Sequence, residues 1–253
     1  EKEAWEDKYL EYGELEATDN NFVDEYRINL TEEVGGDCGE ELNRFISDAA
    51  TILATERGIS EYEKSTLAKQ FVLFDFRHHL YAPLVCVKKN NLKIQVSPVQ
   101  LNEDEKTFVD LLDCYMKNHD AEWTDKSLFL LRNKSKVGMG FFEAGNFYPD
   151  YILWIDTDDK QYINFIDPKG LMHIVPKNPK IKFYKKIKDL EVRLAPSAGD
   201  KQIVLNSFIM SSTRGANLRE WWGMKKPSEH EAMNVYTLDD AKCIEKMIQK
   251  IFQ

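Results

Sequence analysis

Three residues that could act together on a phosphate group stand at the ends of two neighbouring apolar runs. Asp150 opens the first run, and Asp167 and Lys169 close the second. The polar stretch 156–160 between the runs predicts a tight hairpin turn centred between residues 158 and 159. In that register Asp150 lies opposite Asp167, and the period of two along a strand puts Lys169 on the same face. The sequence therefore predicts two carboxylates and an ammonium at one end of the hairpin.

Two opposed carboxylates destabilise a strand pair unless something compensates their charge. Mg²⁺ would do so, because it prefers carboxylate oxygens together with water and phosphate, and Mn²⁺ can substitute for it. Lys169 could orient or deprotonate a water, or stabilise charge on a phosphate. This set predicts metal-assisted hydrolysis of a phosphodiester. The same residue types are also ordinary turn residues at strand ends, and that alternative stays open.

A regular series of elements follows Asn102, which can cap a helix with Glu105 three residues later. Apolar periodicity predicts a mixed α/β domain in which this helix is followed by three strands, a helix and a fourth strand. The expected strands are 127–131, 146–155, 161–167 and 203–210, the basic helix covers about 177–190, and a last helix covers about 238–252.

The first part of the chain has a different character. Residues 1–26 carry ten acidic and two basic residues of a chain with a formal net charge of −9, so the remainder is close to neutral and could carry a basic surface. Helical spacing of apolar residues predicts helices over about 40–57 and 61–80, and a short strand covers 92–96. We therefore expect an acidic, helical attachment at 1–97 and the catalytic domain at 98–253.

Composition excludes several classes of protein. The four cysteines are far apart and form no CxxC pair, which disfavours a zinc ribbon and a disulfide-stapled secreted domain. No apolar run approaches the roughly 18 residues that a membrane span needs, and the chain does not open with a signal peptide. We expect a cytoplasmic protein with no membrane partner.

Asp150, Asp167 and Lys169 match the PD-(D/E)xK nuclease motif, in the form Pro149-Asp150 followed by Asp167-Pro168-Lys169. The α-β-β-β-α-β order is similar to the core of that superfamily, a restriction-endonuclease-like fold. A wider stretch, about 78–253, resembles the C-terminal nuclease region of type III restriction subunits and related helicase–nuclease proteins. The segments 79–84, 98–108 and 138–143 carry this wider resemblance.

The resemblance implies a Mg²⁺-dependent DNA endonuclease coupled to an ATP-dependent motor, with a methyltransferase or specificity subunit as a further partner. This chain has no GxxxxGK[ST] phosphate loop, so ATP would act only through a motor upstream of it. The chain also lacks an initiator Met. We therefore expect a fragment in which residues 1–97 connect that motor to the nuclease.

Further site residues follow from the same comparison. Nucleases of this superfamily often add an acid from the helix before the sheet, for which Glu105 is the candidate third metal ligand and Glu143 the alternative. Other residues could contact nucleic acid or could be a solvated face: Arg132, Lys134, Lys136, Lys185 and Lys186. Trp221 and Trp222 could pack the domain edge or stack on a base.

Two other functions remain open at this stage. A non-catalytic module of the same fold could hold DNA or dock the motor, although such a module has no need for all of Asp150, Asp167 and Lys169. A nuclease acting on RNA, or on branched or damaged DNA, would use the same three residues.

Overall fold

The computed structural model describes residues 27–30, 47, 71–74, 78, 80, 84–87, 94–97, 99–134, 136, 138–141, 145–194 and 201–253. The chain divides into two compact units: Asp24–Asn102 forms one, and Glu103–Gln253 belongs to the other. We had expected the catalytic domain to begin at residue 98.

The unit Asp24–Asn102 contains two antiparallel strand pairs. Strand β1 (Arg27–Leu30) pairs with β4 (Ile94–Ser97), and β2 (Phe71–Phe74) pairs with β3 (Leu84–Val87). The expected helix over 61–80 is therefore wrong at 71–74, where aromatic and branched residues favour a strand. The expected helix over 40–57, apart from the helical Ser47, and the acidic segment 1–26 lie outside the described residues.

The unit that contains Glu103–Gln253 is α/β. Its helices are α4 (Glu103–Asn118), the short 3₁₀ helix η2 (Asp120–Trp123), α5 (Pro179–Leu194), α6 (Gly215–Trp222), α7 (Pro227–Glu231) and α8 (Cys243–Ile251). Its strands are β5 (Ser127–Arg132), β6 (Tyr151–Asp156), β7 (Lys160–Lys169), β8 (Gln202–Ser211) and β9 (Val235–Thr237). The expected order of helix, three strands, helix and strand is confirmed.

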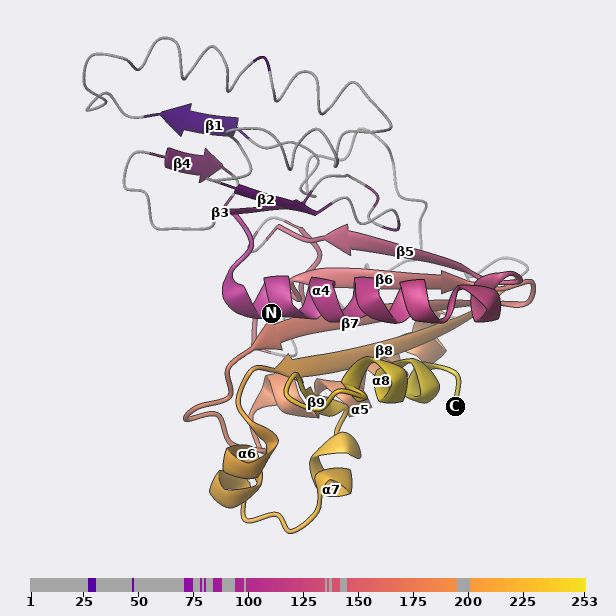
Figure 1. The fold of residues 1–253 in the computed structure, drawn as a ribbon. Coiled ribbons are helices and arrows are strands. Elements are labelled where there is room, and N and C mark those ends of the chain that lie inside the picture. Colours follow the sequence, from indigo (N-terminus) through magenta and orange to yellow (C-terminus); the bar gives the residue numbers. More distant parts are fainter. Residues whose placement is uncertain are drawn as a thin grey trace. The chain divides into compact units, whose positions relative to one another are not determined.

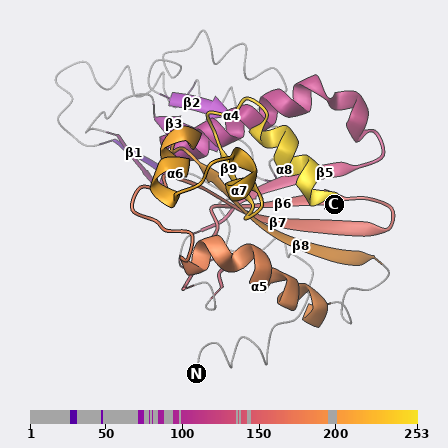
Figure 2. The same ribbon diagram turned by 90° about the horizontal axis from the view of Figure 1, so that it is seen from below.

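The five strands form one mixed sheet in the order β5-β6-β7-β8-β9. β5, β6 and β7 are antiparallel neighbours, whereas β8 and β9 join in parallel. Helices α4 and α8 cover one face and α5 covers the other (Figures 1 and 2). Both faces are therefore buried, and β7 is buried without interruption from Tyr162 to Pro168.

Aromatic contacts identify the two faces. Phe108 of α4 packs on Tyr151 with ring centroids 5.5 Å apart, which places Tyr151 on the α4 face. On the other face Phe141 lies 4.8 Å from Phe165 and 4.6 Å from Phe183 of α5. Since side chains alternate along β7, Asp167 and Lys169 share the α5 face with Phe165.

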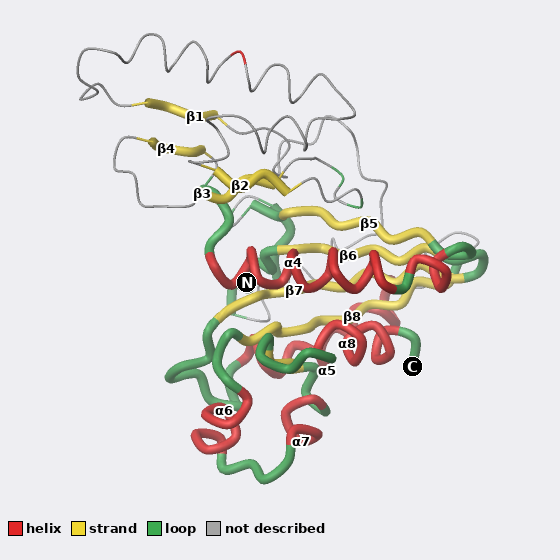
Figure 3. The backbone as a smooth tube through the Cα atoms, viewed as in Figure 1, coloured by secondary structure: helices red, strands yellow, loops and turns green. Residues whose placement is uncertain are grey.

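The segment between β8 and α8 folds into short elements that apolar periodicity did not reveal (Figure 3). α6 ends at Gly223, whose φ of 66° suits a residue without a Cβ. The three-residue strand β9 is defined by its pairing with β8. No local sequence pattern predicts this pairing. In the part of the chain that the structure describes, no helix has the length and apolar character needed to cross a bilayer.

Candidate active site

The hairpin of β6 and β7 has the register that the sequence predicted. The ladder runs from Asp156 opposite Gln161 to Tyr151 opposite Ile166. One further step places Asp150 opposite Asp167. Strand β6 begins at Tyr151 rather than at residue 146, so Asp150 belongs to the end of a loop and not to the strand itself.

A buried asparagine fixes this loop. The Asn133 amide donates to the carbonyl oxygens of Met139 and Pro149, both at 2.8 Å, and its oxygen accepts from the Met139 N–H at 2.9 Å. The Asn133 backbone N–H also donates to the Asp150 carbonyl at 2.8 Å. Asn133 is therefore a positioning residue for Asp150. Nothing in the sequence pattern distinguished it.

We predict that Asn133→Ala lowers the free energy of unfolding by about 1–3 kcal/mol, because the buried Pro149 carbonyl and the partly buried N–H and carbonyl of Met139 lose their hydrogen-bond partner. Urea denaturation of both chains measures this effect. Asn118→Ala, at the exposed end of α4, is the matched control and should change the free energy by less than about 0.5 kcal/mol. Equal, small effects of the two substitutions would contradict a positioning role for Asn133.

Asp167 and Lys169 form an ion pair at the end of β7. Asp167 is 5% exposed, so its carboxylate needs such a partner. Burial and, to a smaller extent, the nearby charge of Lys180 lower the pKa of Lys169 to about 8, although the charge of Asp150 acts in the opposite direction. A lysine with this pKa is partly neutral near pH 8. Its neutral amine can accept a proton and so act as a general base.

Asp150 is a carboxylate held in an unfavourable environment. Burial raises its pKa to about 6, and the positive charges of Lys169, Arg132 and Lys180 only partly oppose this effect. A buried carboxylate with a raised pKa beside a buried lysine with a lowered pKa makes this position a candidate functional site.

Lys180 is the second cation of the site, which sequence reasoning did not single out. It stands in the first turn of α5, and its ammonium lies 5.6 Å from the centroid of the Phe147 ring. The Lys169 ammonium lies 5.5 Å from the same centroid. Among the described residues, no carboxylate forms an ion pair with Lys180. Both ammonium groups lie near the Phe147 ring, and Lys169 is already paired with Asp167. The positive charge of Lys180 could therefore be compensated by a bound anion.

Glu105 has a partner other than the one we expected. Its carboxylate lies 3.1 Å from the Arg132 guanidinium, and both side chains are buried. Arg132 is opposite Tyr151 in the sheet, so this ion pair belongs to the α4 face. Asp150 and Asp167 belong to the α5 face. The structure therefore does not bring Glu105 together with the two aspartates, and it buries Arg132 instead of exposing it to a phosphate.

Asp104, the residue before Glu105, is the α4 acid whose charge acts on Asp150 and adds to the increase in its pKa. Its carboxylate accepts a hydrogen bond from the Ser212 hydroxyl at 2.9 Å. The Ser212 backbone N–H donates to the Lys169 carbonyl at 3.2 Å, which ties the end of β8 to the end of β7. The sequence singled out Glu105 at the start of this helix, whereas Asp104 is the acid of α4 whose charge acts on Asp150.

The other expected residues have mixed placements. Lys136, Lys185 and Lys186 are exposed, and Lys134 is half-buried. Glu143 lies outside the described residues. Among the described residues, no group of three or more His, Cys, Asp and Glu side chains is arranged to hold a metal ion. The acids that face the site are Asp150 and Asp167, with Asp104 at its edge.

Comparisons with known proteins give no match to a family model, a curated protein or a solved structure. A functional proposal for this chain therefore rests on its own residues.

Proposed function

We propose that this chain hydrolyses phosphodiester bonds of DNA with Mg²⁺, as an endonuclease of the PD-(D/E)xK type. One observation carries the proposal. Asp150 directly precedes the Tyr151–Ile166 pair of the β6–β7 ladder and Asp167 directly follows it, and Lys169 lies on the same face as Asp167 with its pKa lowered to about 8. The order of elements in the α/β unit, with its five-stranded mixed sheet, is compatible with this assignment.

The carboxylates fit a hard divalent cation. The pKa of Asp150 is raised by burial, so its charged form lacks the compensation that a cation provides. Asp150 and Asp167 would hold Mg²⁺, and Asp104 could accept a hydrogen bond from its water shell. Mg²⁺ supplies Lewis-acid polarisation of the phosphate when it is bound. Glu105 stays with Arg132 and supports the sheet.

Lys169 would act on the attacking water. Its ammonium already contacts Asp167, and its lowered pKa gives it a neutral fraction near pH 8. A neutral amine at this place can accept the proton that the water loses when it attacks phosphorus. Asn133 would keep Asp150 in place through the loop that it binds.

Lys180 would bind an oxygen of the same phosphate. We predict that Lys180→Met weakens DNA binding and cleavage by about 10- to 100-fold, because one charge-assisted contact to phosphate is lost. The slope of log affinity against log salt should fall by about 1. Fluorescence anisotropy with a labelled duplex measures the affinity and its salt dependence, and plasmid nicking measures cleavage. Lys250→Met on α8, away from this edge of the sheet, is the control and should change neither.

The substrate and partners follow from resemblance and charge. Segment 168–188 holds seven lysines and no acidic residue. Such a segment can bind the phosphate backbone of DNA, a contact that does not distinguish base sequences. Exposed Lys185 and Lys186 belong to this segment, and Lys136 and Lys134 lie on the loop before Asp150. An upstream ATP-dependent motor and a methyltransferase or specificity subunit are the partners that we propose for the full-length protein.

The test is nicking of supercoiled plasmid by the purified 253-residue chain with Mg²⁺ or Mn²⁺. We expect metal-dependent nicking that is removed by a chelator and absent in Asp150→Asn. Nicking that persists at the same rate in that variant would show a contaminating nuclease and would contradict the assignment.

A second function is favoured by the ion pairs of the site. Lys169 already compensates the charge of Asp167 without a metal, and Glu105 is paired with Arg132 on the other face of the sheet. Such a site suits a non-catalytic module that holds DNA or docks the motor. Full-length protein with ATP that binds DNA but never cleaves it, with or without metal, would favour this second function.

A further inference from the structure

The two neighbouring tryptophans of α6 have different environments. The Trp222 indole N–H donates to the Ile174 carbonyl at 2.7 Å, and its ring packs against a cluster of buried apolar residues that includes Leu171 and Leu218. Trp221 is 50% exposed. Trp222 therefore fixes the helix to the loop that follows β7, and Trp221 presents a large aromatic surface to solvent.

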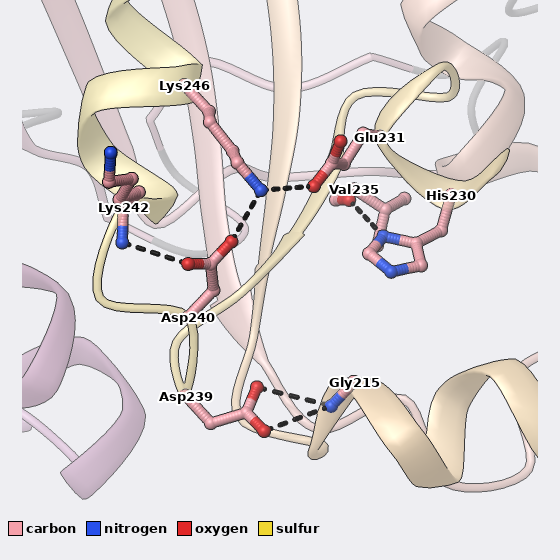
Figure 4. Close-up of polar contacts among 8 residues, drawn as sticks. All are labelled: Gly215, His230, Glu231, Val235, Asp239, Asp240, Lys242 and Lys246. Atoms are coloured by element: carbon pink, nitrogen blue, oxygen red, sulfur yellow. Dashed lines mark hydrogen bonds and ion pairs between the residues drawn. The ribbon is translucent and has the colours of Figure 1, made fainter. Parts of the chain in front are cut away.

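Helix α6 is fixed at its other end as well. Both oxygens of the Asp239 carboxylate accept from the Gly215 backbone N–H at 3.2 Å, which satisfies a free donor at the start of the helix (Figure 4). The segment that carries Asp239 is held in turn by Lys246, whose ammonium lies 2.7 Å from both Glu231 and Asp240 (Figure 4). Trp221 thus stands on a helix whose two ends are both fixed.

This helix begins beside the candidate active site. Ser211 is opposite Lys169 in the sheet, and α6 starts four residues after Ser211. The Leu171 backbone N–H donates to the Thr213 hydroxyl at 2.9 Å, which joins the two chain segments that leave the sheet there. Trp221 is the seventh residue of α6, so it lies roughly 9 Å along the helix axis from its start.

The surroundings of Trp221 suit a polyanion. The segment 213–226 holds four basic residues and one acidic residue, and its exposed cations are Arg214, Lys225 and Lys226. The loop that Trp222 contacts leads into the lysine-rich segment of α5. Exposed aromatic rings and exposed cations are the residue types with which proteins bind an unpaired nucleic-acid strand, because the ring stacks on a base and the cations contact the backbone.

We propose that Trp221 is a stacking platform for a base of an unpaired DNA strand, such as the single-stranded arm of a forked DNA. Bases inside a duplex already stack on each other and offer no free face to the ring. The role of this surface in guiding a strand to Lys169 rests on the nuclease function proposed above, whereas the binding itself does not.

The test measures binding without divalent metal, so that no cleavage occurs. Fluorescein-labelled oligonucleotides of 20 nucleotides, as a single strand and as a duplex, are titrated with the whole chain at low salt and followed by anisotropy. We expect Trp221→Ala to weaken single-strand binding by roughly 5- to 100-fold and duplex binding by less than about twofold. Trp221→Phe should retain most of the affinity, since a phenyl ring still stacks.

Val192→Ala is the matched control, because Val192 is an exposed apolar residue near the far end of α5. It should change neither affinity. Circular dichroism checks that each variant folds. Single-strand binding that is equal in wild type and Trp221→Ala, or lost to the same degree for both oligonucleotides, would overturn the proposal. Equal binding would leave the exposed Trp221 as a contact for a protein partner.

The two proposals fail separately. A wild-type chain that never nicks plasmid but loses single-strand binding on Trp221→Ala would refute the nuclease and support the platform. A chain that nicks plasmid normally but binds single strands independently of Trp221 would support the nuclease and refute the platform.

Discussion

Replacement of Lys169 with methionine is expected to slow metal-dependent DNA cleavage by about 10²- to 10⁴-fold. Methionine keeps the apolar stem of the side chain but removes the amine that accepts a proton from the attacking water. The rate is measured from single-turnover nicking of supercoiled plasmid at pH 8. Metal binding by the variant should persist, because Asp150 and Asp167 are unchanged.

One further variant separates the chemistry of Lys169 from its structural role as the partner of Asp167. Lys169→Arg keeps a positive charge beside Asp167, but a guanidinium does not lose its proton in this pH range. If Lys169 is the base, both variants should be slow, and the Arg variant should fold as stably as wild type. Cleavage by Lys169→Met at the wild-type rate would show that Lys169 has no part in the mechanism. If only Lys169→Arg cleaves at the wild-type rate, the role of Lys169 is electrostatic.

Replacement of Asp150 with asparagine is expected to stabilise the metal-free chain while abolishing cleavage. Burial raises the pKa of Asp150 from 3.8 to about 6, so the folded state binds its proton more tightly than the unfolded state does. The resulting cost to stability is absent below pH 3.8, grows as pH rises to about 6, and stays constant above that value. At pH 7.5 Asp150→Asn should therefore raise the free energy of unfolding by about 1–3 kcal/mol.

Metal should reverse the order of stability. Mn²⁺ binds the folded wild type through ionised Asp150 and should stabilise it in proportion to the logarithm of its concentration. The same ion should leave Asp150→Asn almost unchanged. Urea denaturation at pH 5 and 7.5, with and without Mn²⁺, gives all four comparisons. A metal-free Asp150→Asn chain that is less stable at pH 7.5 would mean that the carboxylate makes favourable contacts in the fold, which argues against a metal site.

The hairpin and its register could be predicted from the sequence because both depend on local features. Two apolar runs of strand-forming residues flank a polar turn, and the Thr157 N–H closes that turn on the Lys160 carbonyl at 2.9 Å. The periodicity of α4 and α5 is equally local. These features were sufficient to place Asp150, Asp167 and Lys169 at one end of the sheet.

Other parts of the site depend on contacts between distant segments. Lys180 belongs to the site because the first turn of α5 brings its ammonium to the Phe147 ring. The run of lysines in the sequence does not indicate which lysine makes this contact. Glu105 does not join Asp150 and Asp167 because its carboxylate is hydrogen-bonded to Arg132, 27 residues further along the chain. Strand β2 was mistaken for a helix because an apolar run as short as Phe71–Phe74 fits both periods.

The most direct test of the central claim is the position of a bound metal ion. Crystals of the wild-type chain would be soaked in Mn²⁺ and the ion located by its anomalous scattering. We expect a peak about 2.0–2.3 Å from a carboxylate oxygen of both Asp150 and Asp167, with Lys169 beside it. A Mn²⁺ ion bound elsewhere, with Lys169 still paired to Asp167 and no peak at Asp150, would contradict the metal-dependent mechanism.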